Sequence, residues 1–505
     1  MARVSLPERL ARASAGRPWT TVGAWVLVLV AGTFVTSKLL SGVLTNEVEF
    51  KDKPESVRAQ ALVEDRLRET PVTELFIVRS DGLRFSHPDF RAKMQSLQAD
   101  VTALGPDVVR SAVTFFDTGD RSLISLDEQA MMMPVVLTGT IDEAAEHADE
   151  IRAVAHRATA DPEFRVLVTG GATMFEDFTT MADEDLARGE TFGIVAALII
   201  LVLVFGAVVA AVLPIGLGIA AILLAVATVA LVGQAFDFTF FVVNMITMMG
   251  LAVGIDYSLF IVSRYREERE SGAEKLEAVA LAARTASRAV LFSGMTVVLA
   301  LAGMLIIPTS VFQSVSLGAI FAVVFAVAAS LTLLPAILSL LGDRVNALRI
   351  HRRRGATGGH RFWDWAARRV MARPVVSLVL SAGLLMGAGA FYFGMDIGFS
   401  GVSTMPAEME SRQAFEELAA NFAGGATAPM EIVVAADDVM APEIQLGIQD
   451  LRDRLADDPG FGPSAVEINE AQTLALVSAP VAGDPSSEAA MASVGRIRDV
   501  YVPQA

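Results

Sequence analysis

The chain has 505 residues, of which 53% are hydrophobic, and its mean hydropathy is +0.51. This composition excludes a soluble globular protein of several domains and indicates an integral membrane protein. The chain contains no cysteine, which excludes disulfides and thiolate metal sites, and its net charge of −17 is unevenly distributed.

Seven segments are apolar and long enough to cross a bilayer, which requires about 20 residues with almost no charge. They are residues 18–37, 192–212, 214–234, 240–263, 289–307, 311–341 and 374–394. The sequence therefore predicts seven transmembrane helices, and the domain boundaries lie between them.

The distribution of charge predicts the orientation of these helices. Residues 38–190 carry 16 basic against 29 acidic residues, and residues 396–505 carry 5 against 18, so each segment has a net charge of −13. Residues 1–17, the loop 264–288 and the linker 342–373 together carry 19 basic against 8 acidic residues. Because positively charged segments stay in the cytoplasm, we expect a cytoplasmic N-terminus, all three basic segments inside and both acidic segments outside.

The first apolar segment, 18–37, follows four arginines and could belong to a signal peptide. We predict a retained helix instead. Its apolar core is longer than that of a signal peptide, and the pair Arg17-Pro18 recurs as Arg373-Pro374 before the last apolar segment.

Residues 38–190 alternate between helical and strand periodicity, which predicts an extracytoplasmic α+β domain of the split βαβ, ferredoxin-like kind. The predicted helices are 55–68, 88–104 and 142–159, and the predicted strands are 74–79, 108–116, 131–137 and 165–169. The pair Gly170-Gly171 is predicted to form a turn, because no other part of a phosphate-binding fingerprint accompanies it.

Residues 191–341 are predicted to hold helices two to six, with a tight hairpin at Leu213-Pro214 between helices two and three. Asp256 lies near the middle of the fourth helix. An aspartate at that depth costs about 2.5–3.5 kcal/mol, so we expect it to face the protein interior or a water path. We interpret Asp256, with Tyr257 beside it, as a group that takes up and releases a proton. The alternative is that Asp256 pairs with a basic or polar neighbour and only holds helices together.

Four other residues are predicted to lie near this carboxylate. Gly250 and Gly254 are four residues apart, a spacing that lets a neighbouring helix approach closely. Ser293 and Thr296 of the fifth helix could hydrogen-bond near Asp256, although such hydroxyls more often bond to carbonyls of their own helix.

The linker 342–373 combines basic residues, including His351 to Arg354, with aromatic residues, which predicts an interfacial helix on an anionic leaflet. Residues 374–395 are predicted to form the seventh transmembrane helix. Residues 396–505 then repeat the first outer domain, because Glu55-Ser56 recurs as Glu410-Ser411 before a helix and a strand. The second copy stops before its last strand, so we expect a fragment or a split transporter whose remaining helices come from a missing second half or a homologous chain.

The motif Gly254-Ile255-Asp256-Tyr257, followed by Ser263-Arg264-Tyr265-Arg266-Glu267-Glu268, resembles the MMPL family of the resistance-nodulation-division superfamily. The resemblance covers the whole chain. It implies a twelve-helix exporter of the bacterial inner membrane that exchanges lipids or other hydrophobic molecules for protons. In that family an Asp-Tyr pair on helix four faces a matching pair on helix ten. Asp256 and Tyr257 match the first pair, and this chain does not include helix ten.

The sequence thus predicts a secondary transporter, not an enzyme, with protons as the coupling ion and no other cofactor. Two hypotheses of other classes are a non-transporting membrane receptor that senses lipids and an accessory subunit of protein secretion. Dependence of efflux on the proton gradient would separate transport from sensing. No nucleotide, nucleic-acid or metal site is predicted, since the five histidines do not cluster.

Overall fold

The computed structural model describes residues 5–40, 42–45, 48–67, 71–348, 358–395, 402, 405–422, 429–481 and 488–504, with only the backbone for 358–363, 429 and 488. The chain divides into two compact units. The membrane unit consists of Met1–Asp52 and Glu184–Leu384, and the α/β unit consists of Lys53–Asp183 and Leu385–Ala505. The basic cluster at residues 351–354 lies outside the described residues.

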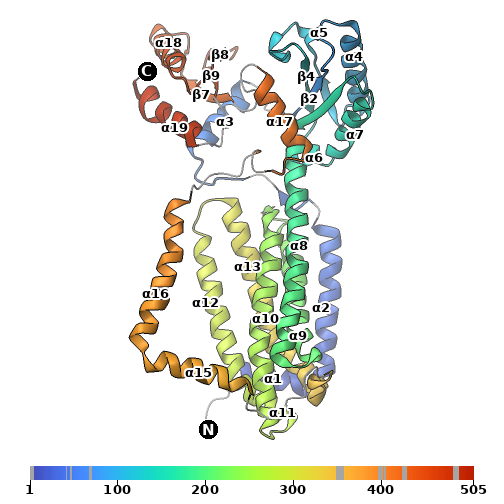
Figure 1. Cartoon of the computed structure of the whole chain (residues 1–505), viewed down its shortest axis with the longest axis vertical. Coiled ribbons are helices and arrows are strands. Elements are labelled where there is room, and N and C mark those ends of the chain that lie inside the picture. Colours follow the sequence, from blue (N-terminus) through green and yellow to red (C-terminus); the bar gives the residue numbers. More distant parts are fainter. Residues whose placement is uncertain are drawn as a thin grey trace. The chain divides into compact units, whose positions relative to one another are not determined.

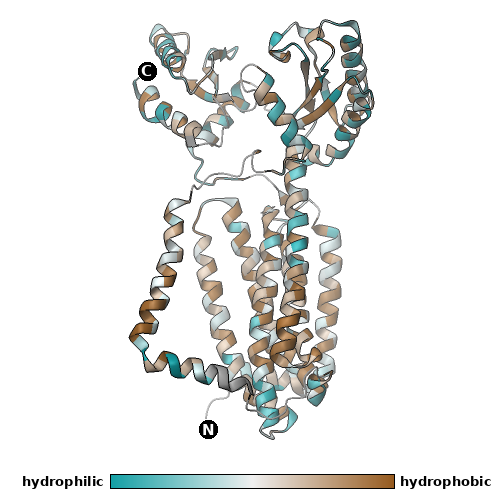
Figure 2. Cartoon of the chain, in the orientation of Figure 1, coloured by the Kyte–Doolittle hydropathy of each residue, from teal (hydrophilic) through white to brown (hydrophobic). Residues whose placement is uncertain are grey.

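Seven helical spans in the described part of the chain are long and apolar enough to cross a membrane, which confirms the predicted polytopic helical protein (Figure 2). The spans are Pro18–Leu39, Gly171–Phe205, Val208–Val232, Phe241–Glu270, Lys275–Met304, Ser310–Asn346 and Pro374–Gly394. In the last of these spans, no residue of the helix Pro374–Ala390 is buried.

The membrane unit is a helical bundle (Figure 1). Its elements are α1 (Leu6–Gly16), α2 (Pro18–Leu39), the end of α8 (Gly171–Phe205), α9 (Val208–Val232), α10 (Phe241–Glu270), α11 (Lys275–Ala282), the π-helix η2 (Ala283–Ser287), α12 (Arg288–Met304), α13 (Ser310–Ala328), the π-helix η3 (Ala329–Leu333), α14 (Leu334–Leu341), η4 (Gly342–Asn346), α15 (Gly358–Ala372) and the start of α16 (Pro374–Ala390). Two short strands, β1 (Leu44–Thr45) and β6 (Phe238–Thr239), pair in parallel. The helix α10 packs against α9 and α13, and α2 packs against α9.

The predicted hairpin at Leu213-Pro214 is wrong. The helix α8 ends at Phe205 and α9 begins at Val208, so the turn lies at Gly206 and the residue after it. Gly206 has a φ of +64°, a left-handed conformation that favours glycine. Pro214 lies inside α9 and is buried. Proline is tolerated inside membrane helices, which is why it is a poor signal for the turn there.

The first part of the α/β unit is a four-stranded antiparallel sheet with the order β3-β4-β2-β5. The strands are β2 (Thr73–Arg79), β3 (Val109–Ala112), β4 (Ala130–Leu137) and β5 (Arg165–Gly170), and the helices between them are α4 (Pro88–Thr102), the short α5 (Phe115–Thr118), η1 (Arg121–Leu123), α6 (Ile141–Ala145) and α7 (Ala148–Thr159). Buried side chains of α4 and α7 cover one face of this sheet, around Phe76 and Val78.

The second part of the α/β unit holds a three-stranded antiparallel sheet with the order β7-β9-β8. Its elements are α17 (Glu410–Asn421), β7 (Pro429–Ala435), α18 (Pro442–Asp457), β8 (Ala465–Ile468), β9 (Leu474–Pro480), α19 (Glu488–Arg496), η7 (Ile497–Tyr501) and α20 (Val502–Gln504), and the 3-10 helix η5 (Phe391–Gly394) precedes them. The helix α18 packs on one face through Ile448, Leu451 and Leu455.

Each sheet of the α/β unit is covered by a helix from the other half of the chain. The helix α17 packs on β5, and its residues Ala414, Leu418 and Phe422 join Ile77 and Leu167 in one buried cluster. In return α3 (Glu55–Arg66) packs on β7 and β9. We call α17 and α3 the crossing helices. Together they tie the two sheets of this unit to each other.

Candidate functional site

The helix α10 is held against α9 by a close approach of the two backbones. A Cβ atom added to Gly254 would lie 2.5 Å from the Cα of Gly218 in α9. A Cβ atom on Gly250 would clash with Ile222, also in α9. Gly250 and Gly254 are buried. These two glycines therefore let α10 pack tightly on α9 one turn before Asp256.

Asp256 lies on a different side of α10, which is exposed. Exposed residues recur at intervals of four along this side: Met248, Ala252, Asp256 and Phe260. Met248 and Phe260 are 63% and 64% exposed. We call these four residues the Asp256 stripe. The carboxylate has no hydrogen-bond or ion-pair partner among the residues that the structure describes.

Of the two expected surroundings of Asp256, the protein interior is therefore not provided by the described residues, and the water path stays a prediction. The interior side of α10 is taken by its packing surface against α9 and α13, which includes Val242, Ile246, Gly250 and Gly254. The carboxylate points away from that surface. The groups that surround the Asp256 carboxylate in the membrane must then lie outside the described residues.

Tyr257 points into the bundle, in contrast to its neighbour. Its side chain is 7% exposed and belongs to the largest apolar cluster of the membrane unit. The ring packs on Gly294 of α12, where an added Cβ atom would lie 3.6 Å from Cε2 of the ring and 3.7 Å from its hydroxyl. The same Cβ atom would lie only 2.4 Å from Cγ2 of Val327, so glycine at position 294 allows the close approach of Val327, a role that sequence reasoning missed.

Ser293 and Thr296 lie on the exposed side of α12. The Thr296 hydroxyl donates to the carbonyl of Phe292 at 2.9 Å, a bond within its own helix. Neither hydroxyl bonds to Asp256 in the described part of the chain. The large apolar residues beside them are also exposed, with Met295 at 59% and Leu299 at 74%. Among the described residues, α10 and α12 therefore each have an exposed, largely apolar face, as do α2, α8 and α16.

A buried carboxylate of the α/β unit, that of Glu74, binds the N-terminus of α8. Glu74 of β2 is fully buried and accepts hydrogen bonds from the amides of Ala172 and Thr173, at 2.7 and 3.3 Å, and from the Thr173 hydroxyl at 2.5 Å. Burial raises the pKa of Glu74, and these hydrogen bonds oppose the rise. The amides at this helix N-terminus are therefore satisfied internally.

The predicted turn at Gly170-Gly171 is a direct junction between β5 and α8 beside this carboxylate. Gly170 is the last residue of β5 and Gly171 the first of α8. A Cβ atom on Gly170 would lie 2.6 Å from Oε1 of Glu74 and would clash with the carbonyl of Thr73. Glycine is therefore required at this position by close packing.

The crossing helix α17 is fixed by polar contacts at both ends. At its start, Glu410 lies 2.7 Å from Nε2 of His156, and Ser411 donates to Asp177. At its end, Glu417 pairs with Arg79 at 2.7 Å. The partners belong to α7, α8 and β2. These contacts fix the register of α17 on the first sheet.

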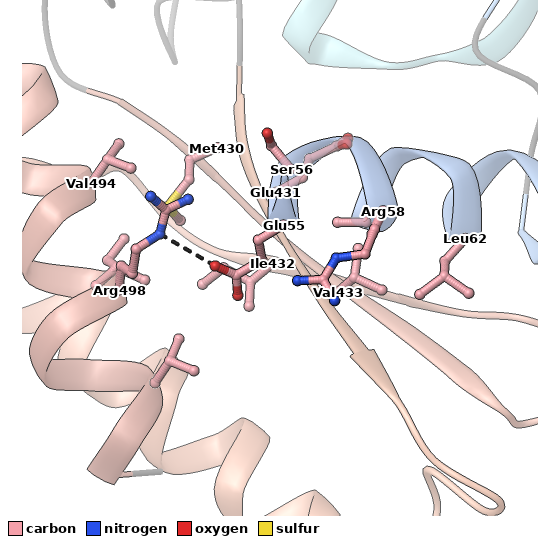
Figure 3. A pocket seen from close by; sticks show the side chains of 13 residues that line it. Glu55, Ser56, Arg58, Leu62, Met430, Glu431, Ile432, Val433, Val494 and Arg498 are labelled. Atoms are coloured by element: carbon pink, nitrogen blue, oxygen red, sulfur yellow. Dashed lines mark ion pairs between the residues drawn. The ribbon is translucent and has the colours of Figure 1, made fainter. Parts of the chain in front are cut away.

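A second feature of the α/β unit is a groove of about 500 Å³ beside β7 (Figure 3). Its floor is apolar and its rim is charged. The lining residues are Glu55, Ser56, Arg58, Ala59, Leu62, Met430, Glu431, Ile432, Val433, Val494, Ile497, Arg498 and Val502. Among the described residues no group of three or more His, Asp or Glu side chains could hold a metal ion.

Comparison with known families identifies the chain. The sequence profile of the MMPL family matches residues 50–377, which is more than half of the chain. The chain belongs to the MMPL family. With its apolar spans, this MMPL protein is a multi-pass membrane protein, and its family is the one that the motif at Asp256 predicted.

Several curated relatives are similar over long stretches. The mycolic acid-containing lipids exporter MmpL11 of Mycolicibacterium smegmatis is 26% identical over 95% of this chain and 51% of its own length. The heme uptake protein MmpL11 of Mycobacterium tuberculosis is 31% identical over 69% of this chain and 37% of its own. The trehalose monomycolate exporter MmpL3 of Mycolicibacterium smegmatis is 30% identical over 59% of this chain and 32% of its own.

The chain spans about half the length, or less, of these curated relatives. The exposed faces of α10 and α12 belong to this half. Sequence reasoning proposed Asp256 and Tyr257 as site residues, which stays a prediction, and it did not point to Gly218, Gly294 or the groove beside β7. Gly218 and Gly294 each interrupt an apolar helix, which is the signal that could have found them.

Proposed function

We propose that this MMPL protein forms one half of a transporter that uses the proton-motive force to export lipids or other hydrophobic or amphiphilic molecules across the bacterial inner membrane. Asp256 and Tyr257 would be half of its proton relay, with protons as the coupling ion and no other cofactor. The N-terminus would lie in the cytoplasm and the α/β unit outside. The observation that carries the proposal is the exposed carboxylate of the Asp256 stripe.

An exposed carboxylate at this depth requires a protein partner. Asp256 lies between Met248 and Phe260, two large apolar side chains that are more than half exposed. Against lipid the ionised carboxylate would cost about 2.5–3.5 kcal/mol. The curated relatives are about twice as long as this chain or longer. A second set of helices, equivalent to the part of the relatives that this chain does not match, would cover the stripe and the exposed side of α12. The cover would shelter the carboxylate from lipid.

Such a sheltered carboxylate suits proton coupling. Burial among apolar side chains favours the neutral form of an acid, so the group can load a proton from the acidic side of the membrane and release it on the other. One charge moved across 100 mV is worth about 2.3 kcal/mol. Tyr257, which is buried and reaches Gly294 of α12, would connect the proton step to the position of α12.

The names of the relatives support the substrate class. Two of them are named as exporters of mycolic lipids, and one is named as a heme uptake protein. All three names describe large, poorly water-soluble molecules. The direction of transport must therefore be measured in both senses, with the substrate inside and outside vesicles.

The substitution Asp256→Asn in the complete transporter tests the relay. We expect gradient-driven export to be lost while the folded protein remains abundant in the membrane. The matched control is Asp237→Asn, which removes an exposed acid from the loop before α10. Export that persists in Asp256→Asn, or that ignores collapse of the proton gradient in the wild type, would refute proton coupling and favour a sensing role.

Covering of the Asp256 stripe can be tested separately. Because the chain lacks cysteine, a single Ala252→Cys on the stripe can be labelled with a maleimide. We expect labelling in the isolated chain and protection when the second half is co-expressed. Equal labelling in both samples would show that the partner does not cover α10.

A further inference from the structure

Three buried hydroxyl groups of the membrane unit have no hydrogen-bond partner among the residues that the structure describes. They belong to Tyr265 of α10, Ser287 of the π-helix η2 and Ser330 of the π-helix η3. All three side chains are 0% exposed. A buried polar group without a partner is rare in proteins and requires an explanation.

Other hydroxyls of this bundle show how a membrane helix usually satisfies such a group. The Ser258 hydroxyl donates to the carbonyl of Gly254 at 2.6 Å, and the Thr228 hydroxyl donates to the carbonyl four residues before it at 2.7 Å. Bonds of this kind within a helix are available to most serine and threonine side chains in apolar surroundings. Ser287 and Ser330 do not form them, and each lies in a π-helix, a rare distortion that is frequent at functional sites.

Tyr265 and Ser287 lie on helix faces that meet at Tyr257. On α10, Tyr257, Ile261 and Tyr265 are four residues apart and all buried, so they share one face. On α12, Gly294 lies against the Tyr257 ring. Ser287 precedes Gly294 by seven residues, or two turns, and is therefore on the same face. The two hydroxyls thus continue the line of contacts that starts at Tyr257.

Ser330 lies on the third helix that reaches this point. Val327, near the end of α13, approaches Gly294 of α12. Ser330 follows Val327 by three residues, which is about one turn. The π-helices η2 and η3 contact each other, and both contact α10. The segments that carry the three hydroxyls therefore meet in one place.

The levels of the three hydroxyls form a series along the bundle. Consecutive spans alternate in direction, so α10 and α13 run one way and α12 runs the other. With a rise of about 1.5 Å per residue, Ser330 lies about 5 Å beyond Tyr257, in the direction that the proposed orientation assigns to the cytoplasm. Ser287 and Tyr265 follow at about 10 and 12 Å. One water molecule spans a step of about 5 Å between two hydroxyl oxygens, because each of its hydrogen bonds is about 2.8 Å long.

Burial of these hydroxyls without water would be unfavourable. One buried polar group without a partner lowers a folding equilibrium constant about 5- to 150-fold. Tyr265 lies in the same apolar cluster as Tyr257, where the protein offers few polar groups. A buried water molecule relieves this cost, since it makes about three hydrogen bonds to otherwise unpaired groups. The arrangement of the three hydroxyls therefore favours bound water.

We propose that Tyr265, Ser287 and Ser330 bind a short chain of water molecules that conducts protons between Tyr257 and the cytoplasmic end of the bundle. This inference rests on the proposed function, which brings a proton to Tyr257. Each water or hydroxyl of the chain accepts one proton and donates another. One proton thus leaves at the far end, and every side chain of the chain remains neutral.

The first test is the stability of Tyr265→Phe, which removes only the hydroxyl and keeps the buried ring. A bound water would lose a partner, so we expect the unfolding equilibrium constant of the full chain in mixed micelles to rise about tenfold. A hydroxyl buried without water would give the opposite sign, because its removal abolishes a desolvation penalty.

The second test detects the water in the unmodified chain. A pulse of X-rays converts bound water into hydroxyl radicals, which oxidise the side chains beside it. We expect Tyr265 to be oxidised several-fold faster than Phe238, the matched control, which is also 0% exposed but belongs to a different apolar cluster. Ser287→Ala should reduce the oxidation of Tyr265, because it removes one of the groups that hold the water.

The third test measures the proton route in the complete transporter. Ser287→Ala and Ser330→Ala should slow gradient-driven export several-fold while the folded protein remains abundant in the membrane. The matched control is Ser258→Ala, which removes a buried hydroxyl that is bonded within α10, and export should be unchanged in this variant.

Three results would overturn the proposal. They are a Tyr265→Phe chain that is more stable than the wild type, oxidation of Tyr265 that is no faster than that of Phe238, and equal export by Ser287→Ala, Ser330→Ala and Ser258→Ala. The first two measurements need no proton gradient. A failure there is therefore distinguishable from a failure of the Asp256→Asn test.

Discussion

The close crossing of α9 and α10 gives a sharp test of how Asp256 is positioned. In Gly254→Ala, the new methyl carbon would lie 2.5 Å from the Cα and 2.9 Å from the backbone nitrogen of Gly218. Carbon atoms in contact prefer about 3.5–4.0 Å. The helices must therefore separate by about 1 Å at this point, because Gly218 has no side chain that could move aside. Such overpacking costs about 1–3 kcal/mol.

The assay is unfolding of the full chain in mixed micelles with increasing denaturing detergent. Gly216→Ala in α9 is the matched control, because a Cβ atom there has no neighbour within 4 Å. We expect the control to be unchanged or slightly more stable, since alanine favours helices over glycine. Equal stability of Gly254→Ala and the control would refute the close crossing.

A double-mutant cycle distinguishes backbone contact from side-chain contact. Gly250→Ala clashes with the side chain of Ile222, which Ile222→Ala removes. We expect the double variant to lose less stability than the sum of the two single variants, by about 1 kcal/mol. Additive losses would show that the two residues do not touch in the membrane.

Three further predictions address other parts of the protein. Because burial raises the pKa of Glu74 above its ordinary value of 4.5 in the folded state, the folded protein binds more protons than the unfolded chain just above pH 4.5. Its unfolding free energy should therefore fall as pH rises through that window, and Glu74→Gln should remove this fall in unfolding curves measured across pH. In the crossing helices, Leu418→Ala should destabilise the α/β unit by about 2–5 kcal/mol and Leu62→Ala by about 1 kcal/mol, measured by denaturant unfolding, because only the first side chain is completely buried. In Gly294→Ala the new methyl carbon would lie 2.4 Å from Cγ2 of Val327, whereas Gly303→Ala has open surroundings, so only the first variant should destabilise the membrane unit in the mixed-micelle unfolding assay.

Much of the fold could be predicted because apolar runs and strand alternation are local signals. The sequence predicts the fourth membrane helix at 240–263, and the structure has it at Phe241–Glu270. It extends beyond the prediction because a helix continues past the apolar region into charged residues at its end. The crossing helices could not be predicted, since periodicity shows which side of α17 is apolar but not which sheet covers it.

The candidate site shows the same difference between what local sequence signals predict and what tertiary packing decides. The desolvation cost of a carboxylate singled out Asp256 from its position alone. Helix geometry places adjacent residues about 100° apart, so Asp256 and Tyr257 had to lie on different sides of α10. The side of α10 that faces α9 is set by the contact of Gly254 with Gly218, which lies 36 positions earlier in the chain. Only the tertiary structure reveals that pairing, and with it the exposure of the carboxylate.

The exchange of crossing helices has a consequence for biosynthesis. The last strand of the first sheet ends at Gly170, but the side of the sheet that contains Ile77 is covered by α17, which ends at Asn421, together with Leu123 of η1. During translation much of this apolar surface stays exposed while about 250 further residues are synthesised and six more membrane spans insert. A chaperone that binds exposed strands would therefore act on the nascent α/β unit in this interval. It would dissociate once α17 and Phe422 pack on the sheet.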